Sequence, residues 1–192
     1  MMVKMTCLYL LMIMVGSTWA ASDLNPTHLH CEFTENPMGV DMAKPRMYWW
    51  VESETSGQKQ TAYQILVASC LDTLDQESGD LWDSGKIESN QTTHVRYQGK
   101  SLASSQQVFW KLRVWDKDGL PSDWSTPATW TMGLLEASDW QARWIVAPWV
   151  SEALLLRKEF SAESKVKRAL VHVCGLGQYN CLSMERRSDK TC

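Results

Sequence analysis

The chain has 192 residues, enough for one or two small domains, and a formal net charge of −3 with acidic and basic side chains mixed along it. This balance lacks the concentrated positive charge that nucleic-acid binding needs, so no nucleic-acid partner is expected. A hydrophobic share of 44% is ordinary for a folded protein, whereas eleven tryptophans indicate a large aromatic core, contacts with carbohydrate, or both.

Residues 1–20 are typical of an export signal. Lys4 supplies positive charge, a short apolar run extends from Cys7 to Val15, and Ala20 is a small residue after which cleavage is expected. The run is too short to span a bilayer, and no later segment is long enough. We therefore expect an exported protein, periplasmic or extracellular, without a membrane span. A buried N-terminal helix is the alternative.

Residues 28–134 carry the pattern of β-strands. Apolar side chains alternate with others around Trp49, around Ile65, and most clearly in the run VFWKLRVW at 108–115. Alternation with a period of two places one set of side chains in a core and the other set on an outer face. Trp49 and Trp110 fall on the predicted core faces.

Turn clusters separate these strands, and no long amphipathic helix is predicted between them. The segment 102–130 resembles the last two strands of fibronectin type III domains, with Trp124 and Ser125 in the place of the Trp-Ser pair that precedes the final strand. The pattern predicts an all-β fold, a fibronectin type III or immunoglobulin-like β-sandwich, with one short helical turn at 71–76. The turn clusters lie at 54–57, 77–80, 98–100 and 116–119.

A second domain is predicted to begin at residue 139 and to extend to 179. The runs LLLRKEF (154–160) and KVKRALVHVCGLGQY (165–179) have the pattern of strands, the second with apolar residues on both faces. Such a strand belongs in a sheet that is covered on both sides, and two strands cannot provide that cover. We therefore expect only the incomplete start of a second β-sandwich.

Three aromatic side chains on the outer faces are candidate carbohydrate contacts, namely Trp50, Trp115 and Phe109. An aromatic ring suits the C–H face of a pyranose. A neighbouring domain could cover the same side chains instead, and we favour this interpretation because large exposed apolar patches usually mark interfaces.

The acidic and imidazole side chains are given structural interpretations. Aspartates in turns are expected to cap backbone N–H groups, so none is predicted to be catalytic. His28 and His30, two residues apart on one face of a strand, are predicted to form a solvated strand edge, because no further metal ligands accompany them. His172 is expected to be a packed core residue. No catalytic residue, metal ion or cofactor is predicted. The aspartates concerned are Asp80, Asp83, Asp116, Asp118, Asp123 and Asp139.

Three cysteines remain once the export signal and the C-terminal tail are set aside: Cys31, Cys70 and Cys174. Their number is odd and their spacing has no CxxC pair, so we interpret them as small buried apolar residues. A disulfide between Cys31 and Cys70 is the alternative.

Seven segments, in this order, resemble the N-terminal region of bacterial α-L-rhamnosidases of glycoside hydrolase family 78. The resemblance covers roughly residues 28–179 and rests on the order of the segments rather than on any one of them. The segments are LHCEFTENPMGVDMAKPRMYW (29–49), QTAYQILVAS (60–69), GDLWDSGKIES (79–89), FWKLRVWDKDG (109–119), ARWI (142–145), LLRKEF (155–160) and VKRALVHVCGLGQY (166–179).

The resemblance implies a fibronectin-like sandwich, then a second sandwich, then an (α/α)₆ barrel that hydrolyses terminal α-L-rhamnosides with inversion. Inversion needs one carboxylic acid and one carboxylate, and both lie in the barrel, beyond residue 192. The chain alone is therefore expected to be inactive. Its partners would be the remaining domains of the parent enzyme and a rhamnose-containing polysaccharide or glycoside. The alternatives are a free-standing carbohydrate-binding module or a cell-surface adhesion module.

Residues 180–192 depart from the family pattern. After GLGQY the family continues with a strand and turn similar to E-L-S-I-N-G-x-K-V-G, whereas this chain has NCLSMERRSDKTC. Codons for the family pattern, read after the loss of one nucleotide, can encode these thirteen residues. We interpret the tail as an out-of-frame reading that follows Tyr179. A natural short tail is the alternative.

Overall fold

The structure, a computed structural model, describes residues 21–146, 155–161, 164–166, 168–176 and 181. The chain divides into two compact units, residues 1–142 and 143–192. The predicted export signal at 1–20 lies outside the described residues, as does the predicted out-of-frame tail apart from Cys181. Within the described residues no helix is long and apolar enough to cross a bilayer.

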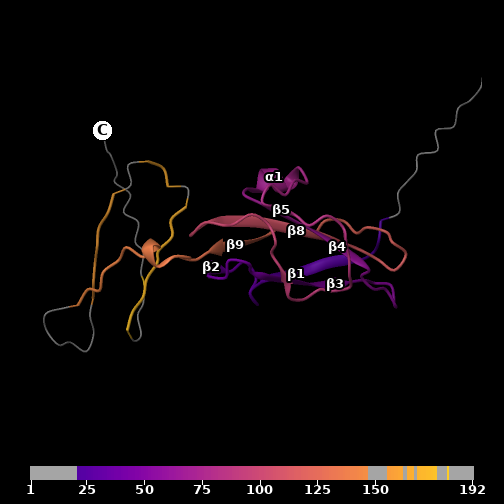
Figure 1. Cartoon of the computed structure of the whole chain (residues 1–192), viewed down its shortest axis with the longest axis horizontal. Helices are drawn as coiled ribbons and strands as arrows, with labels where there is room; N and C mark the ends of the chain where they lie inside the picture. Colours follow the sequence, from indigo (N-terminus) through magenta and orange to yellow (C-terminus); the bar gives the residue numbers. More distant parts are fainter. Residues whose placement is uncertain (1–20, 147–154, 162–163, 167, 177–180, 182–192) are drawn as a thin grey trace, which may run out of the picture. The chain divides into compact units, whose positions relative to one another are not determined.

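The first unit is a sandwich of two β-sheets (Figure 1). The smaller sheet is antiparallel and has the order β1–β3–β7, with β1 at Asn25–Cys31, β3 at Arg46–Glu52 and β7 at Val95–Arg96. The larger sheet has the order β2–β9–β8–β4–β5, and β6 also pairs with β4. Its strands are β2 (Met38–Val40), β4 (Ala62–Ala68), β5 (Trp82–Asp83), β6 (Ile87–Glu88), β8 (Gln107–Trp115) and β9 (Ala128–Met132).

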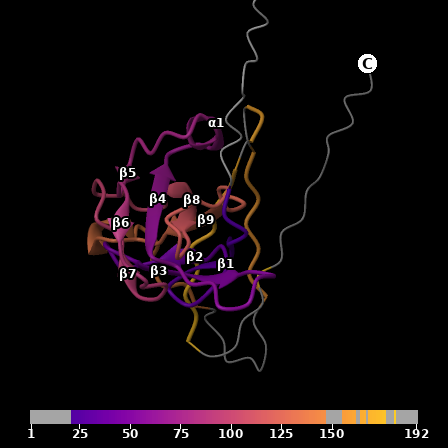
Figure 2. The ribbon, with the colours of Figure 1, turned by 90° about the vertical axis from the view of Figure 1, so that its right-hand side faces the viewer.

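The chain changes sheets between β1 and β2. Strand β1 pairs with β3 in the smaller sheet, while β2 runs parallel to β9 in the larger one. Seen from the end of the sandwich, β1, β3 and β7 line one side and β4, β5 and β8 the other (Figure 2). The predicted β-sandwich is therefore confirmed.

Aromatic side chains fill the space between the sheets. Trp49 of β3 and Trp110 of β8 are fully buried, as the alternation predicts. Trp130 of β9 lies between Trp110 and Tyr97, with ring centroids 6.4 and 5.8 Å away. Several of the eleven tryptophans are therefore core residues, because large rings bury more apolar surface than any other side chain.

The outer face of the larger sheet is also covered. The expected short helix is present as α1 (Leu71–Asp75), and its Leu74 is buried against Leu66 and Ala68 of β4. Alternation alone predicts Ala68 toward solvent, and it is fully buried. The prediction fails there because a period of two shows on which face a side chain lies but not what covers that face.

The second unit does not form the predicted strands in its described part. Residues 155–161, 164–166 and 168–176 carry no strand. Apolar side chains that the pattern assigns to a covered sheet are exposed, among them Val171 and Val173. His172 is exposed as well, so its assignment to a packed core is wrong. Two strand-like runs cannot bury both of their faces without further strands.

The cysteines also differ in part from expectation. Cys31 is a buried free thiol, as predicted, but Cys70 and Cys174 are exposed free thiols. The alternative of a Cys31–Cys70 disulfide is therefore wrong. Cys31 faces the core from β1, whereas Cys70 lies in the turn that leads into α1, where no apolar layer covers it.

Candidate functional site

The outer face of the smaller sheet exposes aromatic rings. Trp50 of β3 is 58% exposed, and its ring centroid lies 4.4 Å from that of His28 on β1. Trp50 pairs in register with Thr27, next to His28, so the two rings come from neighbouring strands. Its place on an outer face agrees with the sequence pattern.

A continuous series of rings extends from Trp50 across this face. The ring centroids of His28 and His30 are 6.5 Å apart. The His30 ring stacks on Tyr48, with 5.0 Å between the ring centroids and only 10° between the ring planes. Tyr48 lies 5.8 Å from Phe33 of the β1–β2 loop. Phe33 in turn contacts His94, just before β7, at 6.2 Å. We call these six side chains, Trp50, His28, His30, Tyr48, Phe33 and His94, the aromatic face.

Irregular backbone places three of these rings. His28, Phe33 and His94 have φ angles of 48°, 73° and 55°, in the left-handed region that non-glycine residues rarely adopt. The β1–β3 register shifts between Thr27 and His30, so a bulge turns the side chain of His28 toward solvent beside His30. Strand periodicity alone does not reveal such a bulge.

Acidic and basic groups border the rings. Arg46 of β3 donates through Nη2 to Glu32 Oε2 at 2.6 Å and through Nε to both carboxylate oxygens. Its guanidinium also lies 4.6 Å from the centroid of Phe33. Hydrogen bonds from Arg46 lower the pKa of the Glu32 carboxyl more than partial burial raises it.

The two histidines of β1 share one carboxylate. His28 Nδ1 is 3.1 Å from Glu35 Oε1, and His30 Nε2 is 3.9 Å from the same oxygen. The spacing of the two histidines predicts that they share one strand face at a solvated edge, but it gives no connection with Trp50. The available signal was His-x-His in one strand and Tyr-x-Trp in another, since paired strands bring such residues side by side. In the part of the chain that the structure describes, no three His, Cys, Asp or Glu side chains form a group that could hold a metal ion.

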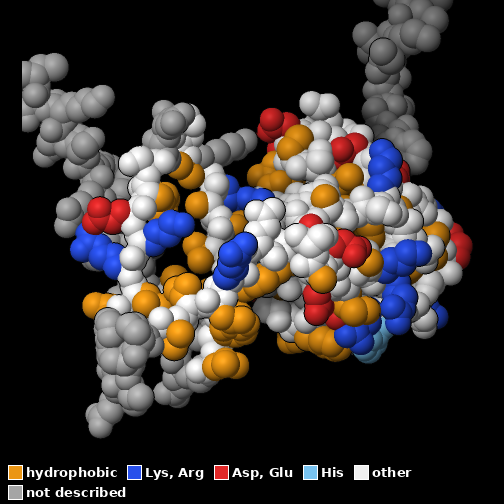
Figure 3. All heavy atoms as spheres, turned by 60° about the vertical axis from the view of Figure 1, so that its left-hand side comes forward, with side chains coloured by type: hydrophobic (Ala, Val, Ile, Leu, Met, Phe, Trp, Pro, Cys, Tyr) orange, Lys and Arg blue, Asp and Glu red, His pale blue; other side chains and the backbone are white. Residues whose placement is uncertain are grey.

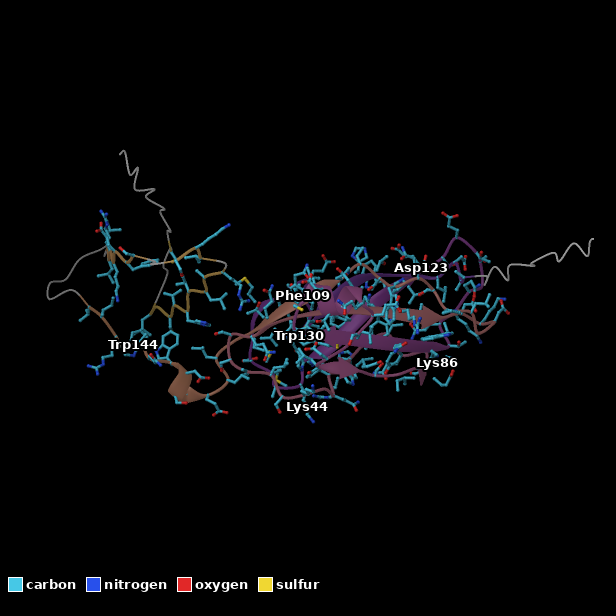
Figure 4. The ribbon with its side chains drawn as sticks, turned by 90° about the horizontal axis from the view of Figure 1, so that it is seen from above. Lys44, Lys86, Phe109, Asp123, Trp130 and Trp144 are labelled. Carbon is cyan, nitrogen blue, oxygen red and sulfur yellow. The ribbon has the colours of Figure 1, made fainter. Side chains whose placement is uncertain are left out.

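Phe109 lies on the other sheet. It is partly buried and packs against Leu66, Ala68 and Leu74 beneath α1. Figure 4 shows it toward one end of the domain, with Lys86 and Asp123 toward the other. The helix that covers Phe109 belongs to the same chain, so its position on an outer face needs no neighbouring domain.

Trp115, at the end of β8, is only 8% exposed. Lys86 Nζ and Arg113 Cζ each lie 5.1 Å from its ring centroid. Cations close to the ring leave little of it for a ligand. The structure therefore does not bring the three candidate residues together, because Trp50 lies on the smaller sheet while Phe109 and Trp115 lie on the larger one. Whether any of them binds sugar stays a prediction.

Carboxylates in the turns hold backbone and hydroxyl groups. Asp80 accepts hydrogen bonds from the backbone N–H and the hydroxyl of Ser69, at 2.9 and 2.8 Å. Asp139 accepts the hydroxyl of Ser104, which lowers the pKa of the Asp139 carboxyl. Asp83 and Asp116 likewise accept backbone N–H groups. These contacts are the capping roles that turn aspartates are expected to have.

Two surface hollows among the described residues are further candidate sites. One, of about 450 Å³, is lined by residues that include Ser53, Gln58 and Asn90, and Lys59 is the one charged residue in its lining. The other, of about 390 Å³, includes Glu77 and Asp123, both of them exposed. A general acid of a glycosidase needs surroundings that keep it protonated, which an exposed carboxylate lacks. Neither hollow has the side chains for glycoside hydrolysis.

Two facing sheets with an aromatic core, a parallel β2–β9 pair and carboxylates engaged in turns define the first unit as an immunoglobulin-like β-sandwich module. A family model described as Rha78A-like, N-terminal immunoglobulin domain, matches residues 26–136, and the chain belongs to this family. The predicted resemblance to the N-terminal region of α-L-rhamnosidases is thereby confirmed.

Full-length relatives and solved structures agree with this assignment. An α-L-rhamnosidase of Formosa agariphila is 36% identical over 75% of this chain, which covers 18% of that relative. The α-L-rhamnosidase structure from Dictyoglumus thermophilum matches with a TM-score of 0.62 and 40% identity, over 64% of this chain and 14% of that one. The structure of Streptomyces avermitilis α-L-rhamnosidase complexed with L-rhamnose also has a TM-score of 0.62, with 43% identity, over 65% of this chain and 12% of that one. The chain spans less than a fifth of the length of these relatives.

Proposed function

We propose that this chain serves as a non-catalytic accessory module of an α-L-rhamnosidase of glycoside hydrolase family 78, and that it braces the remaining domains of that enzyme. The observation that supports this most directly is the match of residues 26–136 to the N-terminal immunoglobulin domain of this family. The share of each relative that the chain covers, 12 to 18%, is the size of such a module.

The chemistry of the described residues supports the same proposal. Hydrolysis with inversion requires a protonated carboxylic acid and a second carboxylate about 6.5–9.5 Å away with room for water between them. Asp80 and Asp139 are instead engaged by Ser69 and Ser104, and hydrogen bonds of this kind favour the charged carboxylate over the protonated acid. A β-sandwich of this kind can hold and position a catalytic domain without doing chemistry.

We also propose that the module is exported. Residues 1–20, with Lys4 and a small residue at Ala20, fit a cleaved signal, which would place the module in the periplasm or outside the cell. Intact-mass measurement of the protein secreted by a bacterial host checks this, and the mature chain is expected to begin at Ala21. A secreted product that retains Met1 would contradict the cleavage.

The fibronectin type III likeness is also a proposal. It is supported by Trp124 and Ser125, which lie just before β9. Ser125 joins β8 through the backbone bond from Ser125 N–H to Leu112 C=O, 2.8 Å long. The coarser description, an immunoglobulin-like sandwich, does not depend on it.

Activity can be tested on the purified chain. With p-nitrophenyl α-L-rhamnopyranoside as substrate, we expect no release of p-nitrophenol above that of a buffer blank. The matched positive control is the α-L-rhamnosidase of Streptomyces avermitilis, assayed under the same conditions. Release that scales with the amount of this chain would overturn the non-catalytic assignment.

The bracing role can be tested by exchange. In the Streptomyces avermitilis enzyme, the region equivalent to residues 26–136 is replaced by those residues, and in a control it is deleted. We expect the chimaera to keep the parent's melting temperature and rhamnoside hydrolysis, and the deletion to lower the melting temperature. A chimaera no more stable than the deletion would show that this module does not brace the enzyme.

A further inference from the structure

The two outer faces of the sandwich differ in how far their aromatic rings are exposed. On the larger sheet, α1 covers Phe109, while Lys86 and Arg113 lie close to Trp115. On the smaller sheet, Trp50 and Phe33 of the aromatic face are each 58% exposed. In the space-filling view, histidine side chains lie at the surface beside basic and hydrophobic ones (Figure 3). The aromatic face therefore has rings that no other described residue of the first unit covers.

We propose that the aromatic face is a binding site for a neutral pyranoside, with Trp50 as the ring on which the sugar stacks. The C–H groups on one face of a pyranose carry a weak positive charge and pack well on the electron-rich face of an indole. Sugar hydroxyls need donors and acceptors beside that ring, and the imidazole of His28 and the carboxylate of Glu35 lie there.

The carboxylates on this face already have partners, which favours a neutral ligand. Glu32 is held by Arg46 through two nitrogens, and Glu35 contacts both His28 and His30. An anionic or cationic ligand would have to compete with these internal pairs, whereas a hydroxyl can add a hydrogen bond to the lone pairs that the carboxylates still have free. An aromatic surface bordered by carboxylates that already have partners suits an uncharged polyhydroxylated ring.

The face is also preorganised. Three of its six rings, on His28, Phe33 and His94, are held by backbone in the left-handed region, which costs energy that the rest of the fold must offset. Strain of this kind clusters at binding sites, because side chains that are already placed lose less entropy when a ligand binds. Only seven described non-glycine residues have positive φ, and these three share one surface.

A docked protein domain fits this face less well. The outward positions of β1, β3 and β7 carry no aliphatic side chain, and the exposed apolar surface consists of isolated rings. A domain that covered the face would remove water from the Arg46–Glu32 pair and from Glu35, at a cost that such pairs seldom recover. A sugar leaves these groups hydrated or hydrogen-bonded to its hydroxyls.

The inference stands apart from the proposed function, because it can hold whether or not the module braces an enzyme. The test uses the purified chain and three probes: methyl α-L-rhamnopyranoside, cellohexaose and, as a planar aromatic without a sugar, p-nitrophenol. Saturation-transfer NMR identifies bound protons, and titration calorimetry gives the dissociation constant. We expect saturable, millimolar binding of at least one glycoside, with transfer strongest to ring C–H protons.

Variants assign the binding to the face. Trp50→Ala should weaken glycoside binding by at least about tenfold, which corresponds to about 1.4 kcal/mol. The matched control is Trp140→Ala, which removes another exposed tryptophan, 41% exposed, outside the aromatic face and should leave binding unchanged. Unchanged melting temperatures establish that both variants fold.

Four results would overturn the inference: no saturable binding of either glycoside, equal losses in the two variants, unchanged binding in Trp50→Ala, or p-nitrophenol binding as tightly as the glycosides. In the chimaeric enzyme described above, protection of Trp50 from N-bromosuccinimide without any sugar would identify the face as a domain interface and would overturn it as well. A chimaera that is no more stable than the deletion variant, with no other change, neither supports nor contradicts sugar binding at the aromatic face.

Discussion

The guanidinium carbon of Arg113 lies 4.6 Å from the ring centroid of Trp124, on the outer face of the larger sheet. The same guanidinium is 5.1 Å from Trp115, and Lys111 and Lys86 lie over the opposite ends of this pair, each 5.1 Å from a ring. Cations and indoles therefore alternate along this face. Each such contact stabilises the fold by about 0.5–1 kcal/mol, and by more where water is excluded.

Removal of the central cation should destabilise the domain. Arg113 also donates from Nε and Nη2 to Gln64 Oε1, at 3.1 and 2.9 Å, so Arg113→Met loses contacts with two rings and two hydrogen bonds. We expect the free energy of unfolding to fall by about 1–2 kcal/mol, measured by urea titration. Arg96→Met, on the other sheet and exposed, is the matched control and should change it by less than about 0.5 kcal/mol. If the two variants lost the same unfolding free energy, the alternating cations and indoles would make no specific contribution to stability.

The sequence predicts on which face of the sheet the residues of β8 lie, but not which groups pack over them. Alternation in VFWKLRVW places Phe109 and Trp115 outward, and both are outward. Yet Lys86 covers Trp115 from 29 residues earlier in the chain, and α1 covers Phe109 from 34 to 38 residues earlier. Contacts between residues this far apart in the sequence depend on the course of the connecting loops, and local periodicity carries no information about that course.

Ser125 replaces a missing strand partner for β8. Strand β9 pairs with β8 only as far as Trp110, and beyond that Ser125 Oγ accepts the N–H of Leu112 at 3.2 Å. Ser125→Ala leaves this buried N–H without its side-chain acceptor, and we expect a loss of about 1–3 kcal/mol in unfolding free energy. Thermal and urea unfolding measure it. The control, Ser56→Ala in the exposed β3–β4 loop, should be neutral, and an equally neutral Ser125→Ala would exclude this role.

The aromatic face shows where sequence reasoning stops. Tyr48 and Trp50, two apart in β3, are placed on one face by strand geometry alone. His28 joins them only through the bulge in β1, and Phe33 and His94 only through left-handed backbone in loops. Gly adopts such conformations freely, and Asn, Asp and His are enriched among the few other residues that do, but a single His or Phe is too weak a signal to predict left-handed backbone.

The Arg46–Glu32 pair should make stability depend on pH. Hydrogen bonds from Arg46 lower the folded-state pKa of Glu32 below its ordinary 4.5. The stabilisation from this ion pair is therefore complete at pH values above the ordinary pKa of Glu32. It is lost as the pH falls through the lower pKa that Glu32 has in the folded state. Glu32→Gln should reduce the unfolding free energy at neutral pH by about 1–2 kcal/mol and match the wild type in strong acid.

Urea titrations at several pH values provide this measurement. Glu54→Gln, in the exposed β3–β4 loop, controls for the loss of one negative charge and should follow the wild type at every pH. A Glu32→Gln deficit that persists undiminished in acid would mean that packing, and not the charged pair, accounts for it.

The free thiols should differ in reactivity because only the thiolate is a nucleophile. Burial raises the pKa of the Cys31 thiol to about 12, whereas a hydrogen bond from Thr73 lowers that of the exposed Cys70. In folded protein at mildly alkaline pH, iodoacetamide should therefore alkylate Cys70 and leave Cys31 free, as peptide mass spectrometry can determine for each site. Thr73→Val should slow the reaction at Cys70, and unfolding in urea should make Cys31 react as fast as Cys70. Rapid alkylation of Cys31 in the folded chain would mean that β1 opens, since a buried thiol at this strand position has no other route to the reagent.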